Sequence, residues 1–249
     1  MMRCPTFKML GSKARTATWL MNFFPKDVNS YFEPFTGRGN VYYRWRYSGG
    51  NANNYYLNDL NLHNFLIALR DYSGDYSFVD EPPINKALWQ KWKDSPDSFE
   101  KSLAESYIAR MGNVYSMGPN NTCSKNKHSR ESTIKRMKFA KLLLKSTSIQ
   151  KLDWLDFLQS HTIKEDDFVY VDPPYNVKQA VFYDNIDHEQ FLNYMNSLNC
   201  KVAISGYYSE LYDSKLKNWK LYTRERSSTA KKVIDGKKKK VVEHLWLNY

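Results

Sequence analysis

The octapeptide FVYVDPPY, residues 168–175, carries the most informative local pattern in the chain. Its first half, Phe168–Val171, is a short apolar run, which predicts a buried strand. Asp172 ends that strand, and two consecutive prolines with fixed φ follow it. Because ligands bind outside the carboxyl ends of strands in open α/β sheets, an acid held at this position is a candidate functional residue.

Strands and helices alternate on both sides of this octapeptide. The expected strands are 29–36, 55–58, 148–152, 168–171 and 201–205, and the expected helices are 41–47, 61–72, 153–160, 187–198 and 208–216. Two further strands, near 218–224 and 241–248, predict an antiparallel C-terminal hairpin. Gly49, Gly50 and the Asn cluster at 51–54 indicate a turn. The repeated strand–helix units predict an α/β fold with a mostly parallel, twisted sheet.

Residues 73–147 interrupt the alternation. They are polar and contain several prolines, then an expected helix at 98–110, a stretch rich in Gly, Asn, Ser and Lys at 112–132, and a basic helix at 133–146. A long segment of this kind inside a compact domain is typical of a functional insertion. We therefore predict a core domain made of residues 1–72 and 148–249, with a small, mainly helical inserted region at 73–147.

Positive charge is concentrated in two zones. The 249-residue chain has a formal net charge of +11, yet residues 120–145 alone carry +7 and residues 217–240 carry +8. The rest of the chain is therefore mildly acidic. Two basic zones on such a body predict a face that binds a polyanion, with a solvated surface as the alternative.

The cysteines and the apolar runs exclude several classes of protein. Cys4, Cys123 and Cys200 lie far apart and form no CxxC pair, so the sequence predicts neither a disulfide framework nor a zinc site. There is no apolar signal core at the N-terminus and no run long enough to span a membrane. We expect a cytoplasmic protein that needs no metal.

The residues that follow the strand at 168–171 suit a reaction at an aromatic amine. The exocyclic amine of adenine is a poor nucleophile because its lone pair is conjugated with the ring. Two fixed acceptors for the amine hydrogens would favour a more nucleophilic nitrogen, and Asp172 offers a carboxylate while Pro173 offers a carbonyl. Tyr175 can stack on a base taken out of a duplex. The alternative is a strand followed by a stiff turn and a solvated acid.

A second motif, FEPFTGRG at residues 32–39, follows the first expected strand. Gly37 and Gly39 would let a ligand approach the backbone closely. Asp59 ends the next strand, twenty positions later, where an acid typically binds the ribose of a nucleotide-like cofactor. The phosphate pattern GxGxxG is absent, which favours a nucleoside cofactor. The alternative is that Asp59 caps the following helix.

In this order, the motifs resemble those of the Dam-type DNA adenine methyltransferases, the D12 class, alpha group. The matching elements are the opening turn Lys8–Lys13, with Ser12 in place of a glycine; FxGxG at 35–39; Asp59; the pair Asp153 and Trp154; DPPY at 172–175; Phe182 and Tyr183; Ser205–Tyr207; and the terminal strand Glu243–Tyr249. The resemblance covers most of residues 7–72 and 148–249.

The resemblance implies a Rossmann-like S-adenosylmethionine-dependent methyltransferase fold and direct methyl transfer to the N6 amine of a flipped adenine in duplex DNA. It implies catalytic roles for Asp172, Pro173, Pro174 and Tyr175. The cofactor, S-adenosyl-L-methionine, would contact Gly11, Lys13, Phe35, Gly37, Gly39, Asp59, Asp153, Trp154 and Asp172. Candidate DNA contacts are Arg110, Asn113, Lys125, Lys127, Arg130 and Arg136. We expect a monomer in a bacterial or phage-infected cytosol.

Other interpretations stay open at this point. The acceptor is alternatively cytosine N4, an adenine in RNA or a small molecule, and a catalytically silent nucleic-acid-binding module with the same fold is a further alternative. Structural roles are also possible for single residues: Lys13 as a surface charge, Asp153 as a helix cap and Trp154 as part of the core.

Overall fold

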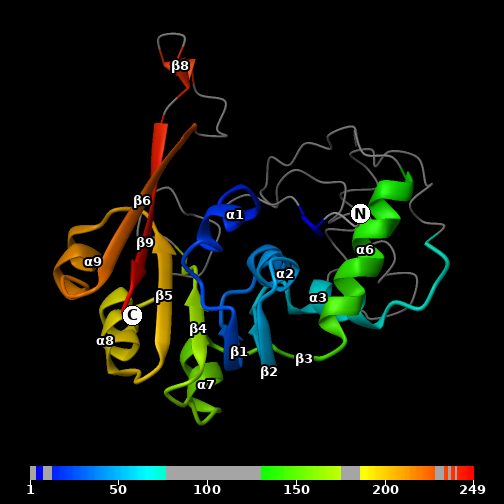
Figure 1. Ribbon diagram of the computed structural model, residues 1–249, viewed down its shortest axis with the longest axis horizontal. Helices are drawn as coiled ribbons and strands as arrows, with labels where there is room; N and C mark the ends of the chain where they lie inside the picture. Colours follow the sequence, from blue (N-terminus) through cyan, green and yellow to red (C-terminus); the bar gives the residue numbers. More distant parts are fainter. Residues whose placement is uncertain are drawn as a thin grey trace.

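The computed structural model describes residues 4–7, 13–76, 130–174, 186–227, 233–234, 237–238 and 240–249 (Figure 1). Its helices are η1 (Lys13–Arg15), α1 (Ala17–Leu20), α2 (Asn40–Tyr47), α3 (His63–Asp71), α6 (Arg130–Leu144), α7 (Trp154–Gln159), α8 (His188–Ser197) and α9 (Glu210–Lys215). Its strands are β1 (Asp27–Glu33), β2 (Asn51–Asn58), β3 (Thr147–Gln150), β4 (Phe168–Val171), β5 (Lys201–Gly206), β6 (Lys220–Ser227), β7 (Val233–Ile234), β8 (Lys237–Lys238) and β9 (Lys240–Leu247).

Seven strands form one sheet in the order β3-β2-β1-β4-β5-β9-β6. The neighbours from β3 to β5 pair in parallel, whereas β9 runs antiparallel to both β5 and β6. The prediction of a mostly parallel sheet with an antiparallel C-terminal hairpin is thereby confirmed, and the fold is Rossmann-like. Strand order reverses between β1 and β4, which makes their carboxyl ends the switch point where ligands bind in such sheets.

The two faces of the sheet have separate hydrophobic cores. Along β4, Phe168 and Tyr170 belong to the cluster that contains residues of α1, α2, α3 and α6, whereas Val169 and Val171 belong to the cluster with α7, α8 and α9. This alternation follows from the two-residue repeat of a strand. All four side chains are fully buried, as is typical of a parallel strand covered by helices on both faces.

Part of the predicted inserted region packs on the core. Met137, Ala140 and Leu144 of α6 are buried in the same cluster as Tyr31 of β1. The hydroxyl of Tyr42 on α2 donates to the carbonyl of Leu143 at 2.7 Å. Residues 77–129 of the insertion lie outside the described residues, so the division into core and inserted region stays a prediction.

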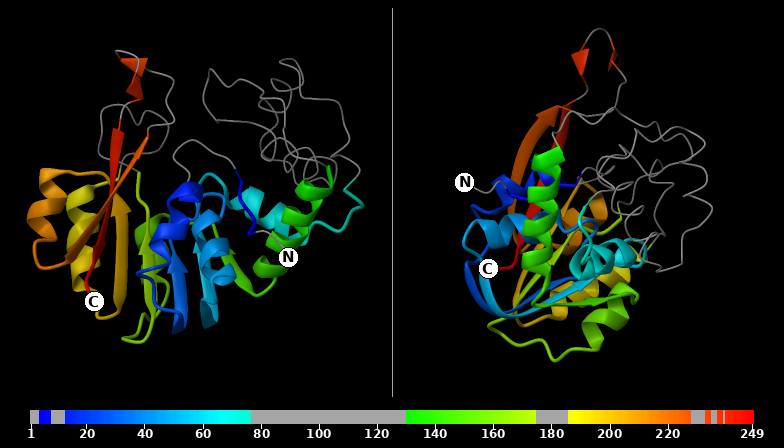
Figure 2. Two further views of the ribbon diagram at one scale, coloured as in Figure 1. Left: turned by 45° about the horizontal axis from the view of Figure 1, so that its top comes forward. Right: turned by 90° about the vertical axis from the view of Figure 1, so that its right-hand side faces the viewer.

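The sequence prediction was wrong for residues 51–54, which form the first half of β2 rather than a turn. Parallel pairing of Asn51 with Asp27 and of Asn54 with Ser30 overrides the weak strand propensity of asparagine. At the other end of the chain, β6 and β9 continue beyond the end of β5 as an arm (Figures 1 and 2).

Candidate active site

The candidate site lies where the carboxyl ends of β1 and β4 meet. These strands are neighbours in the sheet, with Phe32 in register with Val169. The glycine motif follows β1, and Asp172 and Pro173 follow β4, so the topology brings the two strongest sequence motifs to the same edge. Pro173 is buried and Asp172 is half-buried.

The loop after β1 depends on its glycines. Gly37 and Gly39 have φ angles of 58° and 76°, in the left-handed region that favours glycine. A Cβ atom on Gly39 would lie 2.7 Å from the ring of Tyr43, which is fully buried. Thr36 anchors the loop because its hydroxyl donates to the carbonyl of Glu33 at 2.6 Å and its N–H donates to the carbonyl of Asn58 at 2.9 Å.

Asp59 connects this loop to the turn before α3. One carboxylate oxygen accepts from the N–H of Gly37 at 2.7 Å, and the other accepts from the N–H groups of Asn61 and Leu62 at 2.9 and 2.7 Å. Burial raises the pKa of Asp59 although these three N–H groups oppose the rise. The residue thus positions the glycine loop, and its contact with a ribose stays a proposal.

The carboxylate of Asp172 is held from two sides. Its Oδ1 accepts from the hydroxyl of Ser205, at the end of β5, at 3.2 Å and lies 3.1 Å from the Nζ atom of Lys13. The hydroxyl of Ser205 is in turn 2.8 Å from that of Tyr170. Two interactions at one oxygen restrict rotation of the carboxylate.

Lys13 is buried between two acids, so the prediction of a surface charge as its alternative role is wrong. Its Nζ atom donates to Oε2 of Glu243, on β9, at 2.8 Å in addition to the contact with Asp172. Burial alone would lower the pKa of Lys13, but Asp172 and Glu243 raise it above its ordinary value. The ammonium group therefore keeps its charge at neutral pH.

Glu243 has a second cationic partner that sequence reasoning did not identify. Arg226 of β6 donates from Nε to Oε1 of Glu243 at 2.6 Å, and its Nη2 donates to the hydroxyl of Tyr207 at 2.9 Å. Burial would raise the pKa of Glu243, but Lys13 and Arg226 lower it below its ordinary value. The sequence offers one sign that Glu243 has a special role: it is an acid directly before the mostly apolar run HLWL, residues 244–247.

Glu33, at the end of β1, is a further acid that the sequence analysis did not single out. Its side chain is 1% exposed, and the hydroxyl of Tyr31 donates to Oε2 at 2.8 Å. Burial raises the pKa of Glu33 well above its ordinary value; the hydrogen bond from Tyr31 opposes this rise, while the charges of Asp172 and Asp59 add to it. A positive charge close to Glu33 would oppose this rise.

Asp153 and Trp154 have structural roles. The carboxylate of Asp153 accepts from the N–H of Leu155 at 2.9 Å and caps α7. The indole of Trp154 is buried, with ring centroids 5.3 Å from Phe191 and 5.9 Å from Tyr194. The alternatives of helix cap and core residue are thereby confirmed, and contacts with a cofactor stay proposals.

Several predicted site residues lie outside the described residues: Gly11, Arg110, Asn113, Lys125, Lys127 and Tyr175. Arg130 begins α6, but its side chain also lies outside the description. Arg136 is half-buried and donates to the carbonyl of Thr6 at 3.3 Å, which attaches the N-terminal segment to α6. Phe35 packs at the edge of the ring of Phe191, with centroids 6.2 Å apart.

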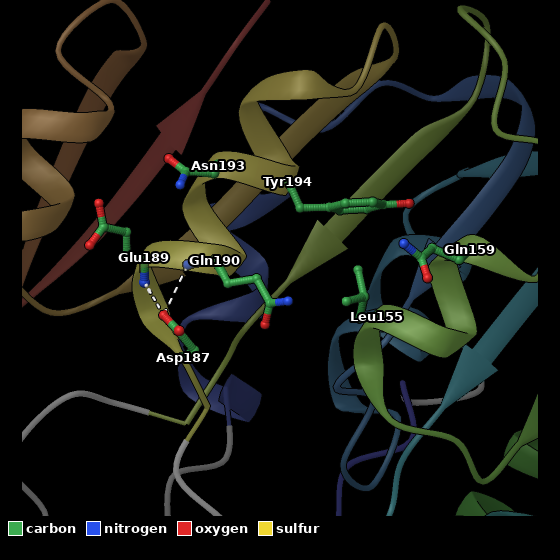
Figure 3. Close-up of a pocket in the computed structure, with 7 residues that line it drawn as sticks. All are labelled: Leu155, Gln159, Asp187, Glu189, Gln190, Asn193 and Tyr194. Carbon is green, nitrogen blue, oxygen red and sulfur yellow. Dashed lines mark hydrogen bonds between the residues drawn. The ribbon is translucent and has the colours of Figure 1, made fainter.

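An open groove of about 520 Å³ lies between α7 and α8 (Figure 3). It is lined by Leu155, Gln159, Asp187, Glu189, Gln190, Asn193 and Tyr194. Asp187 caps α8 by accepting from the N–H groups of Glu189 and Gln190. None of the predicted site residues lines this groove.

Among the residues that the structure describes, no helix has the length and apolar character needed to cross a membrane. In the same ranges, no three His, Cys, Asp or Glu side chains gather in a way that would hold a metal ion.

Comparison with known proteins gives one family match. Residues 10–76 match the model of the D12 class N6 adenine-specific DNA methyltransferases. This segment is a minority of the chain, and it contains Lys13, the glycine loop and Asp59. No curated protein sequence matches the chain. The match and the sheet order together support a methyltransferase that uses S-adenosylmethionine.

Solved structures resemble the chain at low identity. They include TrmN from Thermus thermophilus, with 13% identity and a TM-score of 0.40 over 94% of this chain and 47% of that one. A putative RNA methyltransferase, PH1948 from Pyrococcus horikoshii, has 9% identity and a TM-score of 0.45 over 98% and 86%. The rRNA methyltransferase aviRa from Streptomyces viridochromogenes has 11% and 0.42 over 94% and 83%. The chain spans about half the length of TrmN, and these likenesses concern the fold alone.

Proposed function

We propose that the protein is a Dam-type, alpha-group methyltransferase that transfers a methyl group from S-adenosylmethionine to the N6 amine of adenine in duplex DNA. The observation that carries the proposal is the position of Asp172. It follows β4 at the switch point, next to the glycine loop of β1, and its carboxylate is held by Lys13 and Ser205. The family match over residues 10–76 supports the same activity.

The residues at the strand ends fit the proposed cofactor. Three acids, Glu33, Asp59 and Asp172, lie close enough for their charges to interact, and Glu33 is largely desolvated. Such a cluster favours a ligand with a positive charge, and the absence of a GxGxxG pattern fits a ligand without phosphates. S-adenosylmethionine, when bound, supplies an activated methyl group on a positively charged sulfur.

The chain's own residues would position the acceptor. Asp172 accepts one hydrogen of the adenine amine, and the backbone carbonyl of Pro173 accepts the other. Pro173 and Pro174 fix the backbone that carries this carbonyl. Because the methyl group is already activated, correct placement and electrostatics supply most of the catalysis. Tyr175 would stack on the flipped base.

The DNA would lie on the basic zones. We propose phosphate or base contacts from residues of the inserted region: Arg110, Asn113, Lys125, Lys127, Arg130 and Arg136. Contacts to phosphates would position the duplex, and contacts to base edges would select the sequence. We further propose that the protein acts as a monomer in the cytosol of a bacterium or a phage-infected cell, where it would meet duplex DNA.

The proposal is tested by incubating the purified protein with tritiated S-adenosylmethionine and unmethylated duplex DNA, then digesting the DNA to nucleosides. Label in N6-methyladenine is the expected result. Label in N4-methylcytosine, or label in RNA alone, would contradict the proposed acceptor. Cofactor binding without transfer to any nucleic acid would contradict the proposed reaction.

A further inference from the structure

A chain of charged side chains joins the C-terminal hairpin to Asp172. Lys13 lies between Oδ1 of Asp172, at 3.1 Å, and Oε2 of Glu243, at 2.8 Å. Arg226 holds the other oxygen of Glu243, and its Nη2 also binds the hydroxyl of Tyr207. The ring of Tyr207 lies 5.7 Å from the Nζ atom of Lys13. We call Lys13, Asp172, Glu243 and Arg226 the Lys13 network.

The centre of the Lys13 network is buried, and the network is balanced in charge. The side chains of Lys13 and Glu243 are 3% and 1% exposed. Buried ions are stable only when partners compensate the loss of water. Two cations and two carboxylates provide that compensation, and each oxygen of Glu243 has a cationic partner.

Glu243 and Asp172 both contact the ammonium group of Lys13. The ammonium is closer to Glu243 than to Asp172, so the two carboxylates share one cation. A lone Lys13–Asp172 pair would neutralise Asp172 more completely. A more fully neutralised carboxylate is a weaker acceptor for the hydrogens of an amine, because hydrogen bonds to charged acceptors are the stronger ones.

We infer that Glu243, held by Arg226, is a positioning residue that keeps Lys13 against Asp172 while limiting how far Lys13 neutralises that carboxylate. The inference rests on the proposed function, in which Asp172 accepts a hydrogen of the adenine amine. It assigns a role to two residues of the hairpin, neither of which is expected to touch the reacting atoms.

The opposite charges of Glu243 and Arg226 give opposite predictions for the pH profile of methyl transfer in a single turnover. Glu243→Gln removes a negative charge beside Lys13, so the acidic limb of Asp172 and the alkaline limb of Lys13 both move to lower pH, by about one unit or more. Arg226→Gln removes a positive charge, so the acidic limb of Asp172 moves to higher pH. A role in packing alone would lower activity without opposite shifts.

Glu189→Gln is the matched control. Glu189 pairs with Lys215 at the same 2.8 Å as Glu243 pairs with Lys13, but both side chains of this pair are far more exposed. The control removes the same charge by the same substitution and is expected to leave both limbs in place. If Glu243→Gln does not fold, the upward shift in Arg226→Gln still tests the inference.

A measurement without turnover separates the inference from the proposed function. The ¹⁵N resonance of the Lys13 ammonium, followed by NMR against pH, is expected to lose its proton at lower pH in Glu243→Gln than in the wild type. An unchanged Lys13 titration, or limbs that move in neither variant, overturns the inference alone. A wild-type protein that methylates no adenine overturns the proposed function, whatever the titration of Lys13.

Discussion

Replacing Lys13 by methionine removes the cation that the buried Glu243 and the half-buried Asp172 share. Breaking a buried ion pair from one side costs about 3–5 kcal/mol because an uncompensated charge remains. Arg226 still pairs with Glu243 in the variant, and Ser205 still donates to Asp172. These remaining partners place the expected loss at the lower end, about 3 kcal/mol of the free energy of unfolding.

The matched control is Lys215→Met. Lys215 and Glu189 are also 2.8 Å apart, but their side chains are 31% and 64% exposed, against 3% and 1% for Lys13 and Glu243. An exposed pair contributes about 0–1 kcal/mol. Urea denaturation followed by circular dichroism measures both variants, and we expect the midpoint of Lys13→Met to fall by about 1 M. Equal losses in the two variants would refute the reasoning.

The pH dependence gives a second readout for Lys13→Met. The pKa of Glu243 is lowered in the folded protein, where burial would raise it but Lys13 and Arg226 outweigh burial. Its contribution is therefore present above its unfolded-state pKa and lost as the pH falls. The pKa of Lys13 is raised, so its contribution is present below its unfolded-state pKa and lost at high pH. The gap to the wild type is thus widest between about pH 5 and pH 10.

Three further predictions concern the loop, Glu33 and DNA. Gly39→Ala should lower the free energy of unfolding by about 2–5 kcal/mol, because the new methyl group meets the ring of Tyr43 and φ is positive. Gly49→Ala also has a positive φ but has open space around it, so it should cost only about 1–2 kcal/mol. Equal losses of stability in urea denaturation would contradict the contact with Tyr43. Glu33 has a raised pKa, so its own contribution to the free energy of unfolding falls as pH rises above about 4.5. Glu33→Gln should lack this fall. If the free energy of unfolding changed with pH in the same way in the wild type and in Glu33→Gln, the prediction would be wrong. The affinity for duplex DNA, measured by fluorescence anisotropy, should fall steeply as the salt concentration rises. An affinity that does not depend on salt would contradict the proposal that a basic face binds DNA.

Much of the fold was predictable because several of its strands are short apolar runs that can be recognised from local sequence. The run Phe168–Val171 is buried on both faces, so every residue is apolar or aromatic and the strand is visible in the sequence. The first half of β2 was not predictable for the opposite reason. Asn51 and Asn54 belong to a strand only because β1 pairs with them, and no local pattern reports pairing with a distant segment.

The candidate site was likewise predictable only in part. Asp172, Gly37, Gly39 and Asp59 each follow a predicted strand, and parallel strands bring such positions to one edge. Glu243 was not predictable as a partner of Lys13, since 230 positions separate the two residues and only the antiparallel insertion of β9 beside β5 brings them together. The sequence also left open whether Asp153 and Trp154 serve structure, which the cap on α7 and the buried indole now show.

The most direct test of the central claim compares wild type with Asp172→Asn. Asparagine keeps the size of the side chain but loses the charge, so we expect the single-turnover rate of N6-adenine methylation to fall by about 10²-fold or more while the protein stays folded and still binds S-adenosylmethionine. Circular dichroism and calorimetry with the cofactor supply those two controls. A variant that methylates adenine at the wild-type rate would contradict the role of Asp172 and, with it, the proposed mechanism.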